Sequence, residues 1–105
     1  MLPSVLPKDA VFTAWDNSNA GVIEGARKKR MGVVAGWPDL GVFWRGVVVL
    51  IELKRKRRGV LSAAQKKLHP RLLAAGFPVT LCRSVDEVLD LLTAHGIPLR
   101  GKVMA

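Results

Sequence analysis

Two apolar runs in the middle of the chain, 40–44 and 47–54, are separated only by Arg45 and Gly46. Runs of this length that are rich in Val, Leu, Ile and aromatic residues predict β-strands. A two-residue connection that contains glycine predicts a tight hairpin turn between them. In a hairpin centred on this dipeptide, the numbers of directly paired residues sum to 91.

A helix is expected after the hairpin, beginning at Ser62. Gln65 follows Ser62 at the spacing of a capping box, in which each residue satisfies a backbone N–H of the other. Pro70 is expected to kink or break this helix, and Gly76 to end it. One helical face carries Leu61, Gln65, Leu68 and Leu72.

A strand over 77–83 and a third helix capped by Ser84 complete the C-terminal half. Residues 1–9 and 96–105 are expected to be irregular. Upstream of the hairpin, the pattern predicts a strand over 11–15 and a helix over about 22–31. The buried stripe of the third helix is expected to comprise Val85, Val88, Leu89 and Leu92.

The expected order is strand, helix, two strands, helix, strand, helix. Strands that alternate with helices in this way predict an α/β domain, with a small mixed β-sheet flanked by helices. The length of 105 residues fits one domain with one hydrophobic core. We therefore treat residues 1–105 as a single domain.

The chain is strongly basic. Seventeen Lys and Arg stand against eight Asp and Glu, which gives a formal net charge of +9. This balance favours a polyanionic partner such as nucleic acid, since each neutralised phosphate releases counterions. No apolar run of about 18 residues predicts a membrane span, and the N-terminus lacks the pattern of a secretory signal. With the single Cys82, these features favour a reduced, cytoplasmic setting.

The hairpin register places Asp39 opposite Glu52, with Lys54 on the same face as Glu52. Opposed residues have Cβ atoms about 4.5–5.5 Å apart. Two carboxylates so placed repel each other, and a hard cation such as Mg²⁺ or Mn²⁺ would remove that penalty. The Leu53 carbonyl could add an oxygen ligand. Lys54 could orient a water molecule or meet developing negative charge. Metal-assisted hydrolysis of a phosphodiester is the indicated chemistry.

A Glu-x-Lys triplet on its own is more often a solvated strand face. The opposed acid, the net charge and the basic loop Arg55, Lys56, Arg57 and Arg58 directly after the triplet favour the metal site. This loop is expected to contact phosphate. A register slip of one residue would turn Asp39 to the other face. For Gln65, a purely capping role and a role at the site are both open. His69 is set aside as a structural or exposed residue.

Four segments together resemble one known family. They are 31–40 (MGVVAGWPDL), 51–55 (IELKR), 59–65 (GVLSAAQ) and 76–84 (GFPVTLCRS). This combination resembles the VRR-NUC domain, the virus-type replication-repair nuclease branch of the PD-(D/E)xK superfamily. The resemblance covers about residues 20–95, which is nearly all of the expected domain.

The resemblance implies a restriction-endonuclease-like fold and DNA cleavage that depends on Mg²⁺ or Mn²⁺. By position, Asp39 and Glu52 would bind the metal, Lys54 would be the catalytic lysine, and Gln65 would support the site. The superfamily often has a further acid on an N-terminal helix. Glu24 is the candidate within the first predicted helix, and Asp9 and Asp16 are alternatives in less regular sequence.

The resemblance also implies a partner and an assembly. Small free-standing members look like phage or bacterial endonucleases that act as homodimers on branched DNA, including four-way (Holliday) junctions. Two other readings of the sequence stay open. A basic α/β domain of this size could bind nucleic acid without cutting it. It could also be a subunit of a larger assembly whose charge matches a partner.

Overall fold

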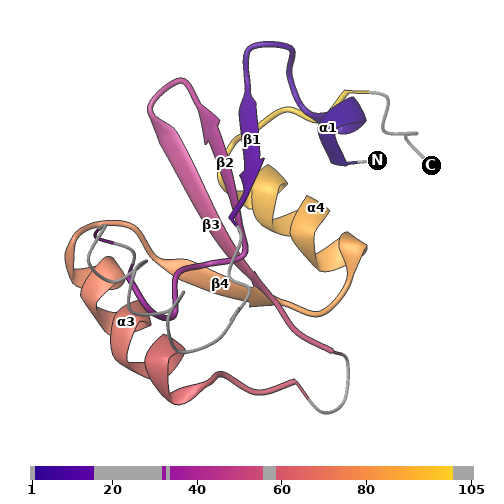
Figure 1. Ribbon diagram of the computed structural model, residues 1–105. Coiled ribbons are helices and arrows are strands. Elements are labelled where there is room, and N and C mark those ends of the chain that lie inside the picture. Colours follow the sequence, from indigo (N-terminus) through magenta and orange to yellow (C-terminus); the bar gives the residue numbers. More distant parts are fainter. Residues whose placement is uncertain (1, 16–31, 33, 56–58, 101–105) are drawn as a thin grey trace.

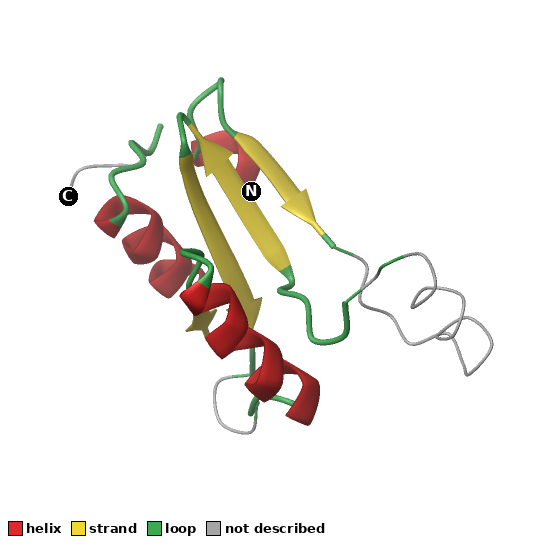
Figure 2. Cartoon of the chain, turned by 90° about the vertical axis from the view of Figure 1, so that its left-hand side faces the viewer, coloured by secondary structure: helices red, strands yellow, loops and turns green. Residues whose placement is uncertain are grey.

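The chain folds around one four-stranded mixed sheet, in which the strands lie side by side (Figures 1 and 2). The computed structural model describes residues 2–15, 32, 34–55 and 59–100. The strand order is β1-β2-β3-β4, and within the described part the helices are α1, α3 and α4. The strands are β1 (Val11–Ala14), β2 (Leu40–Trp44), β3 (Val47–Leu53) and β4 (Val79–Cys82). The helices are α1 (Leu2–Val5), α3 (Ala63–Ala74) and α4 (Val85–Ala94).

The β2–β3 hairpin has the register predicted from the turn. Trp44 pairs with Val47 and Leu40 pairs with Ile51, so paired numbers sum to 91 throughout the ladder. Arg45 and Gly46 both have positive φ, 44° and 82°. Two consecutive residues with positive φ characterise the primed turns that match the twist of antiparallel strands. Local turn chemistry thus fixes which residues of β2 and β3 share a face.

Helix α3 connects β3 to β4, which pair in parallel. Its capping box is complete, with Ser62 and Gln65 bonded to each other's backbone N–H. The expectation that Pro70 would break the helix is wrong, since α3 continues to Ala74. Proline removes one intrahelical hydrogen bond. Burial of Leu68 in the turn before Pro70 helps to offset that loss.

The two longer helices cover opposite faces of the sheet. Ile51 belongs to the core cluster that contains Val88 and Leu92 of α4. Its neighbour Glu52 points the other way and lies beside His69 of α3. Figure 1 shows α3 and α4 on either side of the strands. The sheet is therefore the middle layer of an α/β/α domain, and Glu52 lies between the sheet and α3.

Residues 2–9 and 96–100, which were expected to be irregular, contain regular structure and buried side chains. The lead-in contains the short helix α1, and Leu6 is buried. In the tail, Ile97 is buried and Leu99 packs against the core, because both add apolar cover beyond α4. The Arg100 Nε–H donates to the Leu6 carbonyl at 2.6 Å. Contacts between these distant segments, rather than local pattern, order the two ends.

The stripe predicted for α4 is only partly confirmed. Val88 and Leu92 are buried, Leu89 is half-buried, and Val85 is 49% exposed. Val85 lies in the first turn, where it borders an open hollow at the end of β4. The helix predicted over 22–31, with Glu24, lies outside the described residues, as does 56–58 of the basic loop.

Candidate active site at the open end of the β2–β3 hairpin

Asp39 stands immediately before β2, just beyond the last pair of the ladder, Leu40–Ile51. Its backbone N–H donates to the Ile51 carbonyl at 3.1 Å, so the regular register of the hairpin ends at this residue. Its carboxylate Oδ2 accepts a hydrogen bond from the Leu53 N–H at 2.8 Å. The Trp15 N–H donates to the Asp39 carbonyl at 2.9 Å from the other side. Asp39 is therefore held between β1 and β3, and its carboxyl group lies close enough to Glu52 to interact with it.

Glu52 is a carboxyl group buried in the domain. Its relative exposure is 0%, and neither Oε1 nor Oε2 has an aligned hydrogen-bond partner. Burial, and after it the nearby Asp39 carboxyl through a side-chain hydrogen bond and repulsion, raises the pKa of Glu52 to about 8. The positive charge of Lys54 partly opposes this rise. An ionised Glu52 is thus only partly compensated by the described residues.

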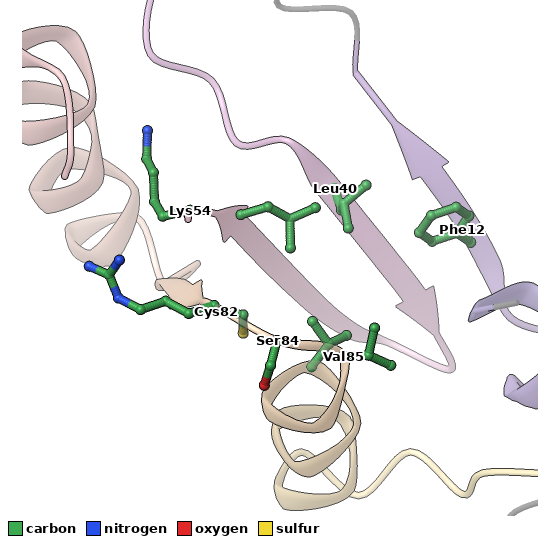
Figure 3. A pocket seen from close by; sticks show the side chains of 9 residues that line it. Phe12, Leu40, Lys54, Cys82, Ser84 and Val85 are labelled. Carbon is green, nitrogen blue, oxygen red and sulfur yellow. The ribbon is translucent and has the colours of Figure 1, made fainter. Parts of the chain in front are cut away.

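Lys54 follows Glu52 by two positions at the end of β3. Its backbone N–H donates to the Cys82 carbonyl at 3.1 Å, which extends the pairing with β4 by one residue. Its charge lowers the pKa of both Glu52 and His69, so the ammonium group lies within electrostatic reach of both. Figure 3 shows the Lys54 side chain directed away from Cys82 and Val85. Two acids and one lysine are therefore gathered at one end of the hairpin.

The structure adds His69 to this group. Its Nε2 atom lies 3.4 Å from Glu52 Oε1, and its side chain is only 14% exposed. Burial, followed by the charge of Lys54, lowers the pKa of His69 below its usual value. The expectation of a merely structural or exposed histidine overlooks this contact. One signal in the sequence could have found it: His69 follows Gln65 by four residues and so shares its helical face.

A solved structure resembles this arrangement of strands and helices over most of the chain. The chain superposes on a VRR_NUC domain protein with a TM-score of 0.64 and 28% sequence identity. The alignment covers 80% of this chain. The chain forms a VRR-NUC-like domain. It spans 66% of the length of that neighbour. No protein-family model and no curated protein matches the sequence.

The fold expected from the sequence is confirmed by this likeness. The VRR-NUC-like domain has the small mixed sheet and flanking helices predicted for a nuclease-type domain. Its sequence likeness was identified from short segments around Asp39, Glu52 and Gln65. Among its described residues, no helix has the length and apolar character needed to cross a bilayer.

Gln65 of the VRR-NUC-like domain is engaged at the start of α3. Its Oε1 accepts from the Ser62 N–H at 2.8 Å, and its own N–H donates to Ser62 Oγ at 3.2 Å. The capping interpretation therefore accounts for the position of the Gln65 carboxamide. A role at the site stays a prediction, which variants of Gln65 can test.

The start of the basic loop is anchored to the end of β4. Arg55 is exposed, and its carbonyl accepts a hydrogen bond from the Arg83 guanidinium. The Arg83 backbone N–H donates in turn to Glu87 at 2.9 Å. Arg83 was not singled out in the sequence, because a basic residue at a strand end has no distinctive pattern. It fixes the point at which the loop leaves β3.

An apolar hollow lies on the α4 face of the VRR-NUC-like domain (Figure 3). Leu40, Leu53 and Cys82 line it, with Phe12 and Val85 at its sides. Residues 40 and 53 point to the face opposite Glu52, since strand side chains alternate. The hollow and the paired acids are therefore separate features.

A divalent cation suits part of this site. The two unpartnered, buried oxygens of Glu52 and the adjacent Asp39 carboxylate are hard oxygen donors. In the described ranges, no three His, Cys, Asp or Glu side chains are grouped closely enough to hold a metal ion. Further ligands would thus come from water, the Leu53 carbonyl or the phosphate itself, as Mg²⁺ sites commonly use.

Proposed function

We propose that this VRR-NUC-like domain is an endonuclease that hydrolyses DNA phosphodiesters with Mg²⁺ or Mn²⁺. The observation that carries the proposal is Glu52: a fully buried carboxyl with no aligned hydrogen-bond donor, beside a second acid and within electrostatic reach of a lysine. A buried charge without full compensation is costly, so a purely structural role would favour an apolar residue there. A bound cation would compensate the negative charge of the two carboxylates.

Asp39 and Glu52 would hold the metal in this proposal. The hydrogen bond from the Leu53 N–H fixes the orientation of the Asp39 carboxylate beside Glu52. When bound, the cation lowers the pKa of a water molecule and polarises a phosphoryl oxygen. Lys54 would neutralise negative charge that develops on the phosphate, because its ammonium group lies within electrostatic reach of Glu52.

The charge of the chain supports DNA as the substrate. The basic loop Arg55, Lys56, Arg57 and Arg58 directly follows Lys54, within a chain of net charge +9. A phosphate backbone brought to the two acids would otherwise be repelled by them. Cationic residues next to the site would offset that repulsion and hold the backbone near the metal.

We further propose branched DNA, such as a four-way junction, as the preferred substrate and a homodimer as the acting form. The resemblance of the sequence to the VRR-NUC family motivates this choice. A domain of 105 residues carries one such site, and two symmetric cuts across a junction need two. A twofold dimer supplies both.

A substrate panel tests the proposal. Purified protein is offered linear duplex, flap and four-way junction DNA, each with EDTA, Mg²⁺ or Mn²⁺, and products are resolved on denaturing gels. Nicks are expected with either metal and not with EDTA, and the junction is expected to be cut fastest. Glu52→Gln should abolish cutting, while Asp90→Asn, which removes an exposed acid on α4, should not change it.

Binding of DNA without cleavage would contradict the proposed nuclease activity. If the junction is bound in a salt-dependent way, and no nicks form with Mn²⁺ under any condition, the domain is a nucleic-acid-binding module. Binding that is insensitive to Asp39→Asn and to Glu52→Gln would support that second function. Light scattering or sedimentation of the free and junction-bound protein tests the dimer independently.

A further inference from the structure

We propose that His69 is a positioning residue for Glu52, donating its Nε2–H to the Glu52 carboxylate when the other carboxylate oxygen binds metal. This inference rests on the proposed metal site. In this inference α3 contributes a side chain to the site, in addition to packing against the sheet that carries Glu52.

The geometry that motivates the inference is a pair of buried polar atoms that face each other. His69 Nε2 and Glu52 Oε1 are 3.4 Å apart, yet they lack the alignment of a hydrogen bond. Neither has another hydrogen-bond partner among the described residues. A buried donor or acceptor without a partner is unfavourable. A small rotation of the Glu52 carboxyl would align the two groups and remove both penalties.

The position of His69 is set by the packing of α3, because its side chain is largely buried and is not free to move in solvent. Leu68, its neighbour, is 5% exposed and anchors this turn of α3. The capping box at Ser62 fixes the start of the same helix two turns earlier. Groups that orient a functional side chain are most effective on rigid elements.

A positioning role fits better than a ligand role. The described residues offer no group of three metal-binding side chains, although Glu52 interacts with Asp39 and is 3.4 Å from His69. The imidazole thus faces the Glu52 carboxyl rather than a point shared by all three. Carboxylates that bind metals are commonly held by a second hydrogen bond, and loss of that partner typically weakens metal binding by about 10–100-fold.

Three variants test the inference: His69→Gln, His69→Leu and His69→Ala. Glutamine can place an amide N–H near the position of Nε2, leucine fills similar space without a donor, and alanine removes both. Mn²⁺ affinity is measured by titration calorimetry without DNA, and the Mn²⁺-induced rise in melting temperature is measured alongside. His95→Ala, an exposed histidine at the end of α4, is the control.

We expect His69→Leu to weaken Mn²⁺ binding about tenfold or more while its melting temperature in EDTA is no lower than that of the wild type. His69→Gln should bind Mn²⁺ nearly as tightly as the wild type, and His95→Ala should match it. Unchanged Mn²⁺ affinity in His69→Leu would overturn the inference. Equal weakening in the Gln and Leu variants would also overturn it, because the donor would then be irrelevant.

A failure of the proposed metal site gives results that differ from a failure of the His69 inference. If the wild type itself shows no Mn²⁺ binding, and Glu52→Gln behaves like it, the proposed metal site is wrong. If the wild type binds Mn²⁺ and loses it in Glu52→Gln, the metal site stands and only the His69 variants decide the inference. Should His69→Ala fail to fold, the Leu and Gln variants still provide the comparison.

Discussion

The Asp39 carboxylate is bonded to the backbone of Leu53, across the open end of the β2–β3 hairpin. Oδ2 accepts the Leu53 N–H at 2.8 Å, next to the pairing of the Asp39 N–H with Ile51. A side chain here takes the place of the next bond of the ladder. The interaction closes the hairpin end and holds the Asp39 carboxylate beside Glu52, so strand geometry and site geometry are coupled at this residue.

Asp39→Asn and Asp39→Ala separate these two roles. Asparagine can still accept the Leu53 N–H through its carbonyl oxygen, so we expect little change in melting temperature but a loss of metal-dependent cutting. Alanine removes the acceptor as well and should cost about 0.5–1.5 kcal/mol of unfolding free energy, because the hydrogen bond is exposed to water. Urea unfolding in EDTA and the junction assay measure the two effects. Equal stability of both variants would show that the Leu53 hydrogen bond does not stabilise the hairpin.

Glu52 should make the metal-free protein less stable as the pH rises. Its pKa is about 8 in the folded chain, against an ordinary value of 4.5, so the folded state binds more protons between these values. The unfolding free energy therefore falls from pH 4.5 to about 8 and levels off above it. Glu52→Gln removes this contribution.

The measurement is urea unfolding in EDTA from about pH 5 to about pH 8.5 for both proteins, a range that spans most of the interval between the two pKa values. The difference between them should favour Glu52→Gln increasingly as the pH rises. A gain of about 1 kcal/mol would raise the melting temperature by roughly 4–8 °C in a domain of this size. A difference that is constant over this range would mean that Glu52 is not the buried acid described above.

Lys54→Met is expected to reduce cutting without weakening metal binding. Removal of an electrostatic stabiliser of the reacting group typically costs about 10²–10³-fold in rate. Mn²⁺ affinity should stay the same or increase, because the variant lacks a positive charge near the two acids. Single-turnover cleavage and calorimetry measure the two quantities, with Lys8→Met, an exposed lysine ahead of β1, as the control. A parallel loss of affinity and rate would assign Lys54 a structural role instead.

The Ser62–Gln65 capping box predicts a stability pattern. Ser62→Ala should destabilise the domain by about 1 kcal/mol, and Gln65→Ala by a similar or smaller amount. Gln65→Glu keeps the box and should retain stability. If the Gln65→Glu and Gln65→Ala variants both cut the junction at the wild-type rate under conditions where they are folded, Gln65 acts only as a cap.

The basic loop should set the salt dependence of DNA binding. Replacement of residues 55–58 by glutamine is expected to reduce the slope of log affinity against log salt by about one for each phosphate that is no longer neutralised. Lys8→Gln is the matched control, because Lys8 precedes β1 near the turn end of the hairpin. An unchanged slope after removal of all four charges would mean that other residues bind the phosphates.

The sequence by itself determined the local geometry of the hairpin and of the start of α3. Arg45-Gly46 fixes a primed turn, and the turn fixes the register as far as the pair Leu40–Ile51, next to Asp39 and Glu52. The capping box at Ser62 is equally local. These features could be predicted because strand alternation, turn conformation and helix capping act between residues that are near in sequence.

Only the tertiary structure decided how deeply Glu52 is buried and what faces it. The burial of Glu52 depends on how α3 packs against the sheet. This packing is the sum of many weak interactions between residues that are distant in sequence, so no local sequence pattern predicts it. That packing brings His69 to 3.4 Å from Glu52 and supports Pro70 within the helix. For the same reason Ile97 is buried beyond α4 while Val85, on the predicted stripe, stays exposed.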